Sequence, residues 1–519
     1  MDRTLLSIDC GTQSTRALIF DLKGNLLAKE QIFYKPYHSP KPGYAEQDAS
    51  IYWQSLQHAT LSLKQKYPKL FSLIAGISVT TLRDTMVPVD KKGKPLYPAI
   101  VWLDQRKADK FFYPNPILKL IFKIIGIDRT IDKLQIQGKS NWLRQRHSDI
   151  WQKTYKYLQI SGFINYKLTG CFTDSIASQI GHIPFDYRKL TWANPKNPFV
   201  LSAQIFPIEQ EKLPNLVKPG EIIGYITEKA SEQTGLPIGL PVIAGGSDKG
   251  CETLGMGVID INMANLSFGT TATIQTTVNK FMEPIPFFPS YPAVVPGYWN
   301  PEIEIYRGFW MISWFKEEFA YKEVMEAEKT GIKPEEVLNQ LLDKAPAGSL
   351  GLIVQPYWTP GLGEDDAKGA IIGFGDVHGK AHVYRSVIEG LVYGLRDGMH
   401  QLEKRGKFKF KNLAVSGGAS QSKKICQITA DVFNKPIVRG YTHETSGLGA
   451  AIITAVGLGF YDDISQAVKE MVKFKDVFEP NVYNSQIYNE LFNKVYKKMY
   501  KRLEPLYKKI RKITGYPEY

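Results

Sequence analysis

Two aspartates stand in glycine-bearing turns that each follow a short apolar segment. Asp9 lies within IDCGTQST and Asp248 within AGGSDKG. Transfer of a phosphoryl group needs a carboxylate that orients or deprotonates the attacking hydroxyl, and a divalent cation, which carboxylates also hold. One acid for each role is a natural division, although an aspartate in a turn can equally cap neighbouring backbone amides.

Hydroxyl-rich turns accompany both aspartates. The residues concerned are Thr12, Ser14, Thr15 and Arg16 in CGTQSTR, and Thr270 and Thr271 in FGTTAT. Their amide, hydroxyl and guanidinium groups are donors of the kind that phosphate oxygens accept. Neither turn has the spacing of a P-loop or of a dinucleotide-binding GxGxxG loop, and single Gly-Thr turns are common connectors. Two such turns that face one another could clamp a polyphosphate.

Other polar groups could meet a second ligand. Arg83 and Asp84 follow a buried-strand run, where a solvated loop is common but where polar ligands of α/β sheets are also bound. Trp102, with Asp104 and Arg106 nearby, could offer an apolar wall of the kind that sugar rings favour, or could be a core tryptophan. The histidines with no common spacing, which we expect to be structural, are His182, His378, His382 and His443.

The elements around these residues indicate an α/β protein. The first fifty residues predict three antiparallel strands joined by tight turns, followed by a helix from Asp48 and a buried strand at 73–79. The FGTTAT turn repeats the strand-turn-strand device of the first hairpin, which predicts two domains built on one plan. We expect these domains at residues 1–256 and 257–482, with a basic helical tail at 483–519.

A long helical pattern at 382–406 carries Gly390, Gly394 and Gly398 on one edge. Glycine inside a helix is unfavourable, so we expect another backbone to approach that edge closely. The segment NLAVSGGASQSKK then reads as a strand, a glycine turn and a helix, in which backbone amides can approach a flat or anionic ligand.

Composition limits the classes of function. The formal net charge is +14, and part of the excess lies in residues 494–512, which predict a solvated helix rather than a nucleic-acid site. No apolar run is long enough for a membrane span or a secretory signal. The four cysteines are widely spaced and suit a reducing compartment. We therefore expect a cytoplasmic protein, with a homodimer possible and with no nucleic-acid or membrane partner.

Taken together, the motifs resemble those of the FGGY carbohydrate kinase family. They are IDCGTQSTRALIFD, TLRDTMVPVDKKGKPLYPAIVWLDQR, YKLTGCFTDSIAS, GGSDKGCETLG, LSFGTTA, and LAVSGGASQSKKICQITADVFNKPI followed by ETSGLGAA. The resemblance spans residues 4 to about 460 and implies two ribonuclease-H-like (actin-like ATPase) domains with an interdomain cleft. It also implies phosphorylation of a sugar or polyol hydroxyl with ATP and Mg²⁺.

The same resemblance implies a role for individual residues. Asp248 would be the catalytic base, and Asp9 with Asp248 would organise the magnesium. Glu444 would be structural. The ATP contacts would be Gly11, Thr12, Gln13, Thr15, Arg16, Gly269, Thr270 and Thr271 at the phosphates, and Gly418, Ala419 and Ser422 at adenine. The substrate contacts would be Arg83, Asp84, Trp102, Asp248 and Lys249.

The acceptor is expected to be a small sugar or polyol. Arg83-Asp84 is similar to the Arg-Glu pair of glycerol kinases, so a glycerol-like polyol or a ketopentose such as xylulose or ribulose would fit. Lys249 beside the base suggests a substrate with an extra acceptor or a negative group. The alternatives are an actin-like or chaperone-type ATPase and a catalytically weak regulatory relative, and the acid in GGSDKG favours the kinase.

Overall fold

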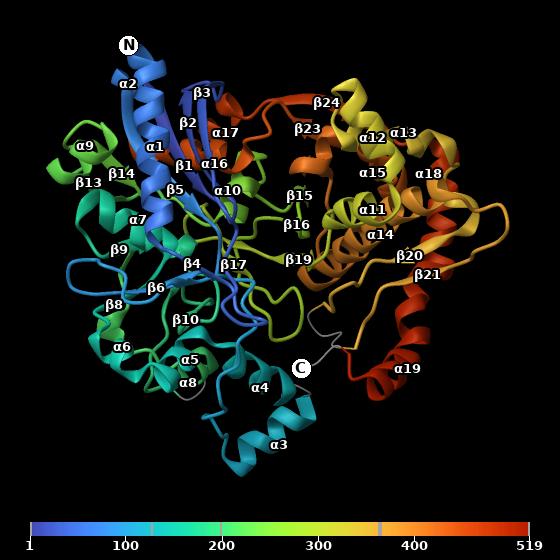
Figure 1. The fold of residues 1–519 in the computed structure, drawn as a ribbon, viewed down its shortest axis with the longest axis horizontal. Coiled ribbons are helices and arrows are strands. Elements are labelled where there is room, and N and C mark those ends of the chain that lie inside the picture. Colours follow the sequence, from blue (N-terminus) through green and yellow to red (C-terminus); the bar gives the residue numbers. More distant parts are fainter. Residues whose placement is uncertain (1–2, 126–127, 198–199, 362–365, 517–519) are drawn as a thin grey trace.

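Two six-stranded sheets form the body of the protein. The computed structural model describes residues 3–125, 128–197, 200–361 and 366–516, and Figure 1 shows the two sheets side by side. The first sheet has the order β13-β14-β5-β1-β2-β3. Its strands are β1 (Thr4–Cys10), β2 (Ser14–Asp21), β3 (Leu26–Phe33), β5 (Ile74–Thr81), β13 (Ile222–Tyr225) and β14 (Pro241–Ile243).

The second sheet repeats the first strand by strand, in the order β19-β16-β15-β22-β23-β24. In each sheet three antiparallel strands are followed by two parallel strands and an outer antiparallel one. The expected repetition of one plan is therefore confirmed. The strands are β15 (Met263–Phe268), β16 (Ala272–Gln275), β19 (Glu302–Ile305), β22 (Asn412–Ser416), β23 (Ile437–Gly440) and β24 (Phe474–Phe478).

The sheets draw their strands from residues 4–243 and 263–478, so the expected boundary at 257 falls between them and stays a prediction. All seven residues of β1 are buried, because a central strand has neighbours on both edges and covered faces. β1 and β2 pair Asp9 with Arg16 and Cys10 with Thr15, which leaves Gly11 to Gln13 as the turn. The three predicted antiparallel strands are confirmed.

Helices cover the sheets as the sequence patterns predicted, with small shifts. Helix α1 (Ser50–Lys66) begins just after Asp48, whose Oδ1 atom accepts a hydrogen bond from the Ser50 amide at 2.9 Å. Helix α14 (Lys380–Gly406) packs on the second sheet. A Cβ on Gly390 would lie 2.5 Å from the Val354 carbonyl oxygen, so a backbone does approach here. Gly394 and Gly398 instead meet side chains of the sheet.

Two helices join the two halves of the molecule. Helix α10 (Asp248–Gly255) packs against helix α16 (Thr445–Gly457), and α16 also contacts β1 and β5 of the first sheet (Figure 1). A Cβ on Gly255 would lie 2.0 Å from the Thr445 carbonyl oxygen, and one on Gly449 would lie 1.9 Å from that of Cys251. The two backbones therefore touch where the helices cross.

The basic segment at 494–512 is helical, as predicted. Most of it forms α19 (Lys497–Thr514), which follows α18 (Val482–Leu491) and a short π-helical turn. Met499 and Tyr507 are buried, whereas the lysines of α19 are exposed. Phe492 just before α19 belongs to the core of the second sheet. Among the described residues, no helix is both long enough and apolar enough to cross a bilayer.

Candidate active site

Asp248 is the first residue of helix α10. The preceding Ser247 is extended and caps the helix, and its Oγ atom accepts a hydrogen bond from the Gly250 amide at 3.2 Å. The Lys249 amide donates to Asp248 Oδ1 at 2.8 Å. Burial raises the pKa of Asp248, while the positive charges of Arg83 and Lys249 oppose that rise. A carboxylate with a raised pKa is suited to accept a proton.

Asp9 lies near the end of β1 and is only 2% exposed. Its Oδ2 atom is 2.9 Å from Nη2 of Arg16, and Arg16 also pairs with Glu444 at 2.8 Å. Burial raises the pKa of Asp9 to about 6 against the opposing charge of Arg16, and the negative charge of Asp248 adds to the rise. The charges of the two predicted acids therefore act on one another.

The first hairpin turn, Gly11 to Gln13, is held in place by hydrogen bonds from two side chains to its carbonyl groups. Tyr34 donates its hydroxyl to the Gly11 carbonyl at 2.7 Å, and Gln47 Nε2 donates to the Thr12 carbonyl at 3.0 Å. Thr12 is half-buried and Gln13 is exposed, so the turn is accessible. Thr15 differs from its neighbours, because it is fully buried and its hydroxyl contacts Tyr34 and Cys10.

The second hairpin turn, Gly269 to Thr271, connects β15 and β16. The Phe309 amide donates to the Gly269 carbonyl at 3.0 Å, and Thr271 Oγ1 donates to the Tyr306 carbonyl at 3.2 Å. Thr270 at the tip is exposed. A covering segment at 306–310 thus supports this turn, as Tyr34 and Gln47 support the first.

Trp102 forms a hydrogen bond to the first hairpin turn. It is 36% exposed, and its Nε1 atom donates to Thr12 Oγ1 at 3.1 Å. Its neighbours are structural, because Arg106 is buried and pairs with Asp104 and Glu46, each at 2.7 Å. Trp102 is the one member of this group with an open face that a sugar ring could contact.

Arg83 forms an ion pair across the two domains. Its Nη1 atom lies 2.6 Å from Glu302 Oε2, its Nη2 atom lies 3.3 Å from Oε1, and its guanidinium stacks on the Tyr291 ring at 5.3 Å. The Glu302 side chain is 2% exposed. Sequence reasoning missed Glu302. The signal was the alternation EIEI, which puts two acids on the same side of an edge strand.

Asp84 is enclosed by two basic side chains. Lys139 Nζ lies 2.5 Å from Asp84 Oδ2, and His182 contacts the same atom through Nδ1 at 2.9 Å and Asp84 Oδ1 through its amide at 3.0 Å. Burial would raise the pKa of Asp84, but the charges of Lys139 and His182 lower it below its ordinary range. His182, expected to be only structural, thus lies beside a predicted substrate contact, and Lys139 was missed.

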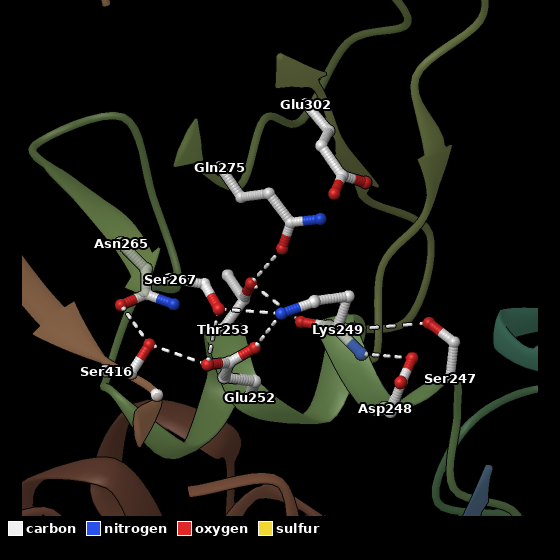
Figure 2. Close-up of polar contacts among 12 residues, drawn as sticks. Ser247, Asp248, Lys249, Glu252, Thr253, Asn265, Ser267, Gln275, Glu302 and Ser416 are labelled. Atoms are coloured by element: carbon white, nitrogen blue, oxygen red, sulfur yellow. Dashed lines mark hydrogen bonds and ion pairs between the residues drawn. The ribbon is translucent and has the colours of Figure 1, made fainter. Parts of the chain in front are cut away.

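Lys249 extends away from the Asp248 carboxylate. Its Nζ atom donates to Ser267 Oγ at 2.6 Å and to Glu252 Oε2 at 2.8 Å (Figure 2). Glu252 is buried and accepts further hydrogen bonds from Ser267 at 2.8 Å and Ser416 at 2.7 Å. The acceptor contact expected at Lys249 stays a prediction, and in the structure its ammonium lies between α10 and the strand that leads to the second hairpin turn.

The predicted adenine segment follows β22 directly. Gly418 and Ala419 lie in a short 3₁₀ helix (Gly418–Gln421), and a Cβ on Gly417 would lie 2.8 Å from the Phe268 backbone. The glycine turn is therefore beside the strand that leads into the second hairpin. Ser422 caps helix α15 (Lys423–Phe433), and its Oγ atom accepts from the Ile425 amide at 3.4 Å.

The acids of this site suit a magnesium ion that arrives with a polyphosphate. Within the part of the chain that the structure describes, no three His, Cys, Asp or Glu side chains converge into a preformed cage. Mg²⁺ at phosphate sites typically uses one or two carboxylates together with water and phosphate oxygens. Asp9, buried with a raised pKa and close to Asp248, fits that requirement.

A cavity of about 380 Å³ lies beside the Arg83–Glu302 pair. Glu302, Glu304, Tyr291 and Tyr306 line it, with residues 284–289 around its rim. Burial and the charge of Glu302 raise the pKa of Glu304 to about 7. This wall of the cavity is therefore acidic and aromatic.

The family models that match both halves of the chain identify a phosphotransferase with an alcohol group as acceptor. The chain belongs to the FGGY family of carbohydrate kinases. The model of the family's N-terminal domain matches residues 4–255, and that of its C-terminal domain matches residues 264–458.

Individual relatives are similar along nearly their whole length. The uncharacterized sugar kinase YgcE of Escherichia coli is 29% identical over 93% of this chain and 91% of its own. A xylulose kinase of Lactococcus lactis is 27% identical over 94% of both chains. The crystal structure of gluconate kinase from Lactobacillus acidophilus has a TM-score of 0.82 and 23% identity, covering 98% of this chain and all of that one. The last likeness supports the fold.

Proposed function

We propose that the protein transfers the γ-phosphate of Mg-ATP to a hydroxyl of a small sugar or polyol. The observation that carries this proposal is the position of Asp248, a half-buried carboxylate with a raised pKa at the start of α10, whose charge acts on Asp9 beside the first hairpin. An ATPase would use such a carboxylate to orient water, so the dependence of turnover on an acceptor separates the two activities.

Each protein group has a separate task in this reaction. Asp248 accepts the proton of the attacking hydroxyl, and Arg83, Asp84 and Trp102 orient the acceptor. Asp9 would hold Mg²⁺, which when bound neutralises the polyphosphate charge. The exposed amides and hydroxyls of the hairpins hold the phosphate oxygens, with Gly11, Thr12 and Gln13 on one side and Gly269, Thr270 and Thr271 on the other.

The remaining ATP contacts follow from the same arrangement. Arg16 has one buried nitrogen, Nε, without a hydrogen-bond partner, and it lies beside Asp9. Gly418 and Ala419 would cover adenine, while Ser422 and Thr15 act mainly by fixing the backbone. Similarity to a xylulose kinase supports a ketopentose such as xylulose or ribulose as acceptor, and the Arg83-Asp84 pair also suits a glycerol-like polyol.

The test is acceptor-dependent ATP consumption by the wild type and two variants. Asp248→Asn is expected to lower kcat by about 1,000-fold or more while ATP still binds, because the general base is lost and the shape is kept. Asp109→Asn makes the same chemical change at an exposed ion pair and serves as the control. Full activity of Asp248→Asn, or wild-type turnover that no acceptor stimulates, would refute the proposal.

A further inference from the structure

We infer that the acceptor site selects uncharged polyhydroxy compounds against polyhydroxy carboxylates, and that Glu302 is the residue that sets this preference. The inference rests on the proposed function and adds the charge class of the acceptor to it.

The cations beside Asp248 already have carboxylate partners. Arg83 and Lys249 are the cations whose charges act most strongly on Asp248, and Arg16, which pairs with Asp9 and Glu444, also interacts with it. Arg83 is held by Glu302 at 2.6 Å and Lys249 by Glu252 at 2.8 Å. Lys139 is the ammonium nearest to Asp84, and its Nζ atom pairs with the Asp84 carboxylate at 2.5 Å. An anionic acceptor therefore meets cations that are neutralised before it arrives.

A second glutamate lies near Arg83, in addition to its partner Glu302. Glu302 and Glu304 both come from strand β19 of the second domain and line the cavity next to Arg83. In Figure 2, Glu302 lies across from the start of α10, separate from the Lys249 and Glu252 pair. Like charges at short range repel, so this wall opposes an acceptor carboxylate.

A neutral acceptor meets no such obstacle. A guanidinium has five N–H donors, and the pair with Glu302 engages two of its nitrogens, so further donors remain for hydroxyl oxygens. A hydroxyl can also donate to a carboxylate such as Glu302 or Glu304. A carboxylate acceptor that used the same donors would instead bring a further negative charge beside Glu302 and Glu304.

The wild-type enzyme is tested with acceptors that are matched in length. Gluconate is paired with glucitol and ribonate with ribitol, and xylulose, ribulose and glycerol complete the panel. At pH 8 the best neutral acceptor is expected to exceed every aldonate by about 100-fold in kcat/KM. An aldonate that is used as well as the best neutral compound overturns the inference and leaves the kinase proposal standing. If no acceptor of either charge stimulates ATP turnover, it is the kinase proposal that fails.

The role of Glu302 is tested by Glu302→Gln, which keeps the shape and removes the charge. Because Arg83 is then free to pair with an acceptor carboxylate, the neutral-to-aldonate ratio is expected to fall about tenfold. Glu335→Gln makes the same change in the Lys316–Glu335 pair, remote from the site, and should leave the ratio unchanged. An unchanged ratio in folded Glu302→Gln contradicts the assignment. If that variant does not fold, the neutral-to-aldonate ratio of kcat/KM for the wild-type enzyme tests the charge preference by itself.

Discussion

The Oγ atom of Ser416 lies 2.7 Å from Oε1 of Glu252, and this hydrogen bond joins the end of β22 to the helix that begins with Asp248. The same carboxylate oxygen accepts from Ser267, two residues before the second hairpin turn. Glu252 therefore connects three parts of the site: the catalytic helix, the phosphate turn and the glycine turn that precedes the adenine segment.

The first prediction concerns the pair that Glu252 makes with Lys249. Glu252→Ala leaves a buried ammonium without its anion and is expected to destabilise the protein by about 3 to 5 kcal/mol. Adding Lys249→Met removes that ammonium, so the double variant should recover part of the loss. Denaturant unfolding of wild type, both single variants and the double variant measures the coupling. Additive losses would show that the pair is not coupled.

The second prediction tests whether Lys249 affects the rate of the reaction or the choice of acceptor. Since its ammonium faces Ser267 and Glu252, Lys249→Gln is expected to reduce kcat about tenfold without changing the order of preference among acceptors. The kcat/KM values across the acceptor panel provide the measurement. A reordering of acceptors would instead restore Lys249 as a direct substrate contact.

The third prediction uses the raised pKa of Asp9, about 6 against an ordinary 3.8. The folded protein keeps this proton up to about pH 6, while the unfolded chain releases it near pH 4. Unfolding therefore releases a proton in that window, and the contribution of Asp9 to the free energy of unfolding falls as pH rises from 4 to 6. Above pH 6 the accumulated penalty is about 3 kcal/mol.

Asp9→Asn removes this penalty. Without Mg²⁺ at pH 8, the variant is expected to unfold at a temperature no lower than the wild type, although its catalysis is weakened. The advantage should disappear toward pH 4, where Asp9 is neutral in both states. Thermal unfolding from pH 4 to 8 gives the curve, and a variant that loses stability equally at every pH would contradict the account.

The fourth prediction concerns the environment of Asp84. Lys139→Met removes the ammonium that pairs with this carboxylate, so the pKa of Asp84 should rise and acceptor binding should weaken. We expect the KM for the acceptor to rise about tenfold while the KM for ATP stays the same. Steady-state kinetics with each substrate varied in turn makes the distinction. A rise in the KM for ATP alone would place Lys139 elsewhere in the mechanism.

The part of the site that the sequence predicted is local in the chain. Asp9 with its hairpin and Asp248 with its helix are each defined by fewer than about ten consecutive residues, where turn and cap preferences act directly. The paired plan of the sheets could be predicted for the same reason, since the second hairpin repeats the first.

The contacts that tune the site are distant in the chain and gave no such signal. Arg83 meets Glu302, and Asp84 meets His182, only after the sheets have formed. The direction of Lys249 depends on Ser267 from another strand, so the identity of residue 249 alone gave no sign of that contact. The glycine edge of α14 shows the same limit, because one glycine meets backbone and the others meet side chains.

The contact between α10 and α16 also determines how far the base can travel. Backbone meets backbone at Gly255 and Gly449, so the helices are closest at this crossing, and a small rotation of one helix over the other would turn about it. Asp248 lies about two helical turns, roughly 10 Å, from Gly255. With that lever arm, a rotation of about 10° moves its carboxylate by about 2 Å, which is enough to make or break a hydrogen bond. A small rotation of one domain relative to the other is therefore sufficient to bring the Asp248 carboxylate to the acceptor hydroxyl or to withdraw it.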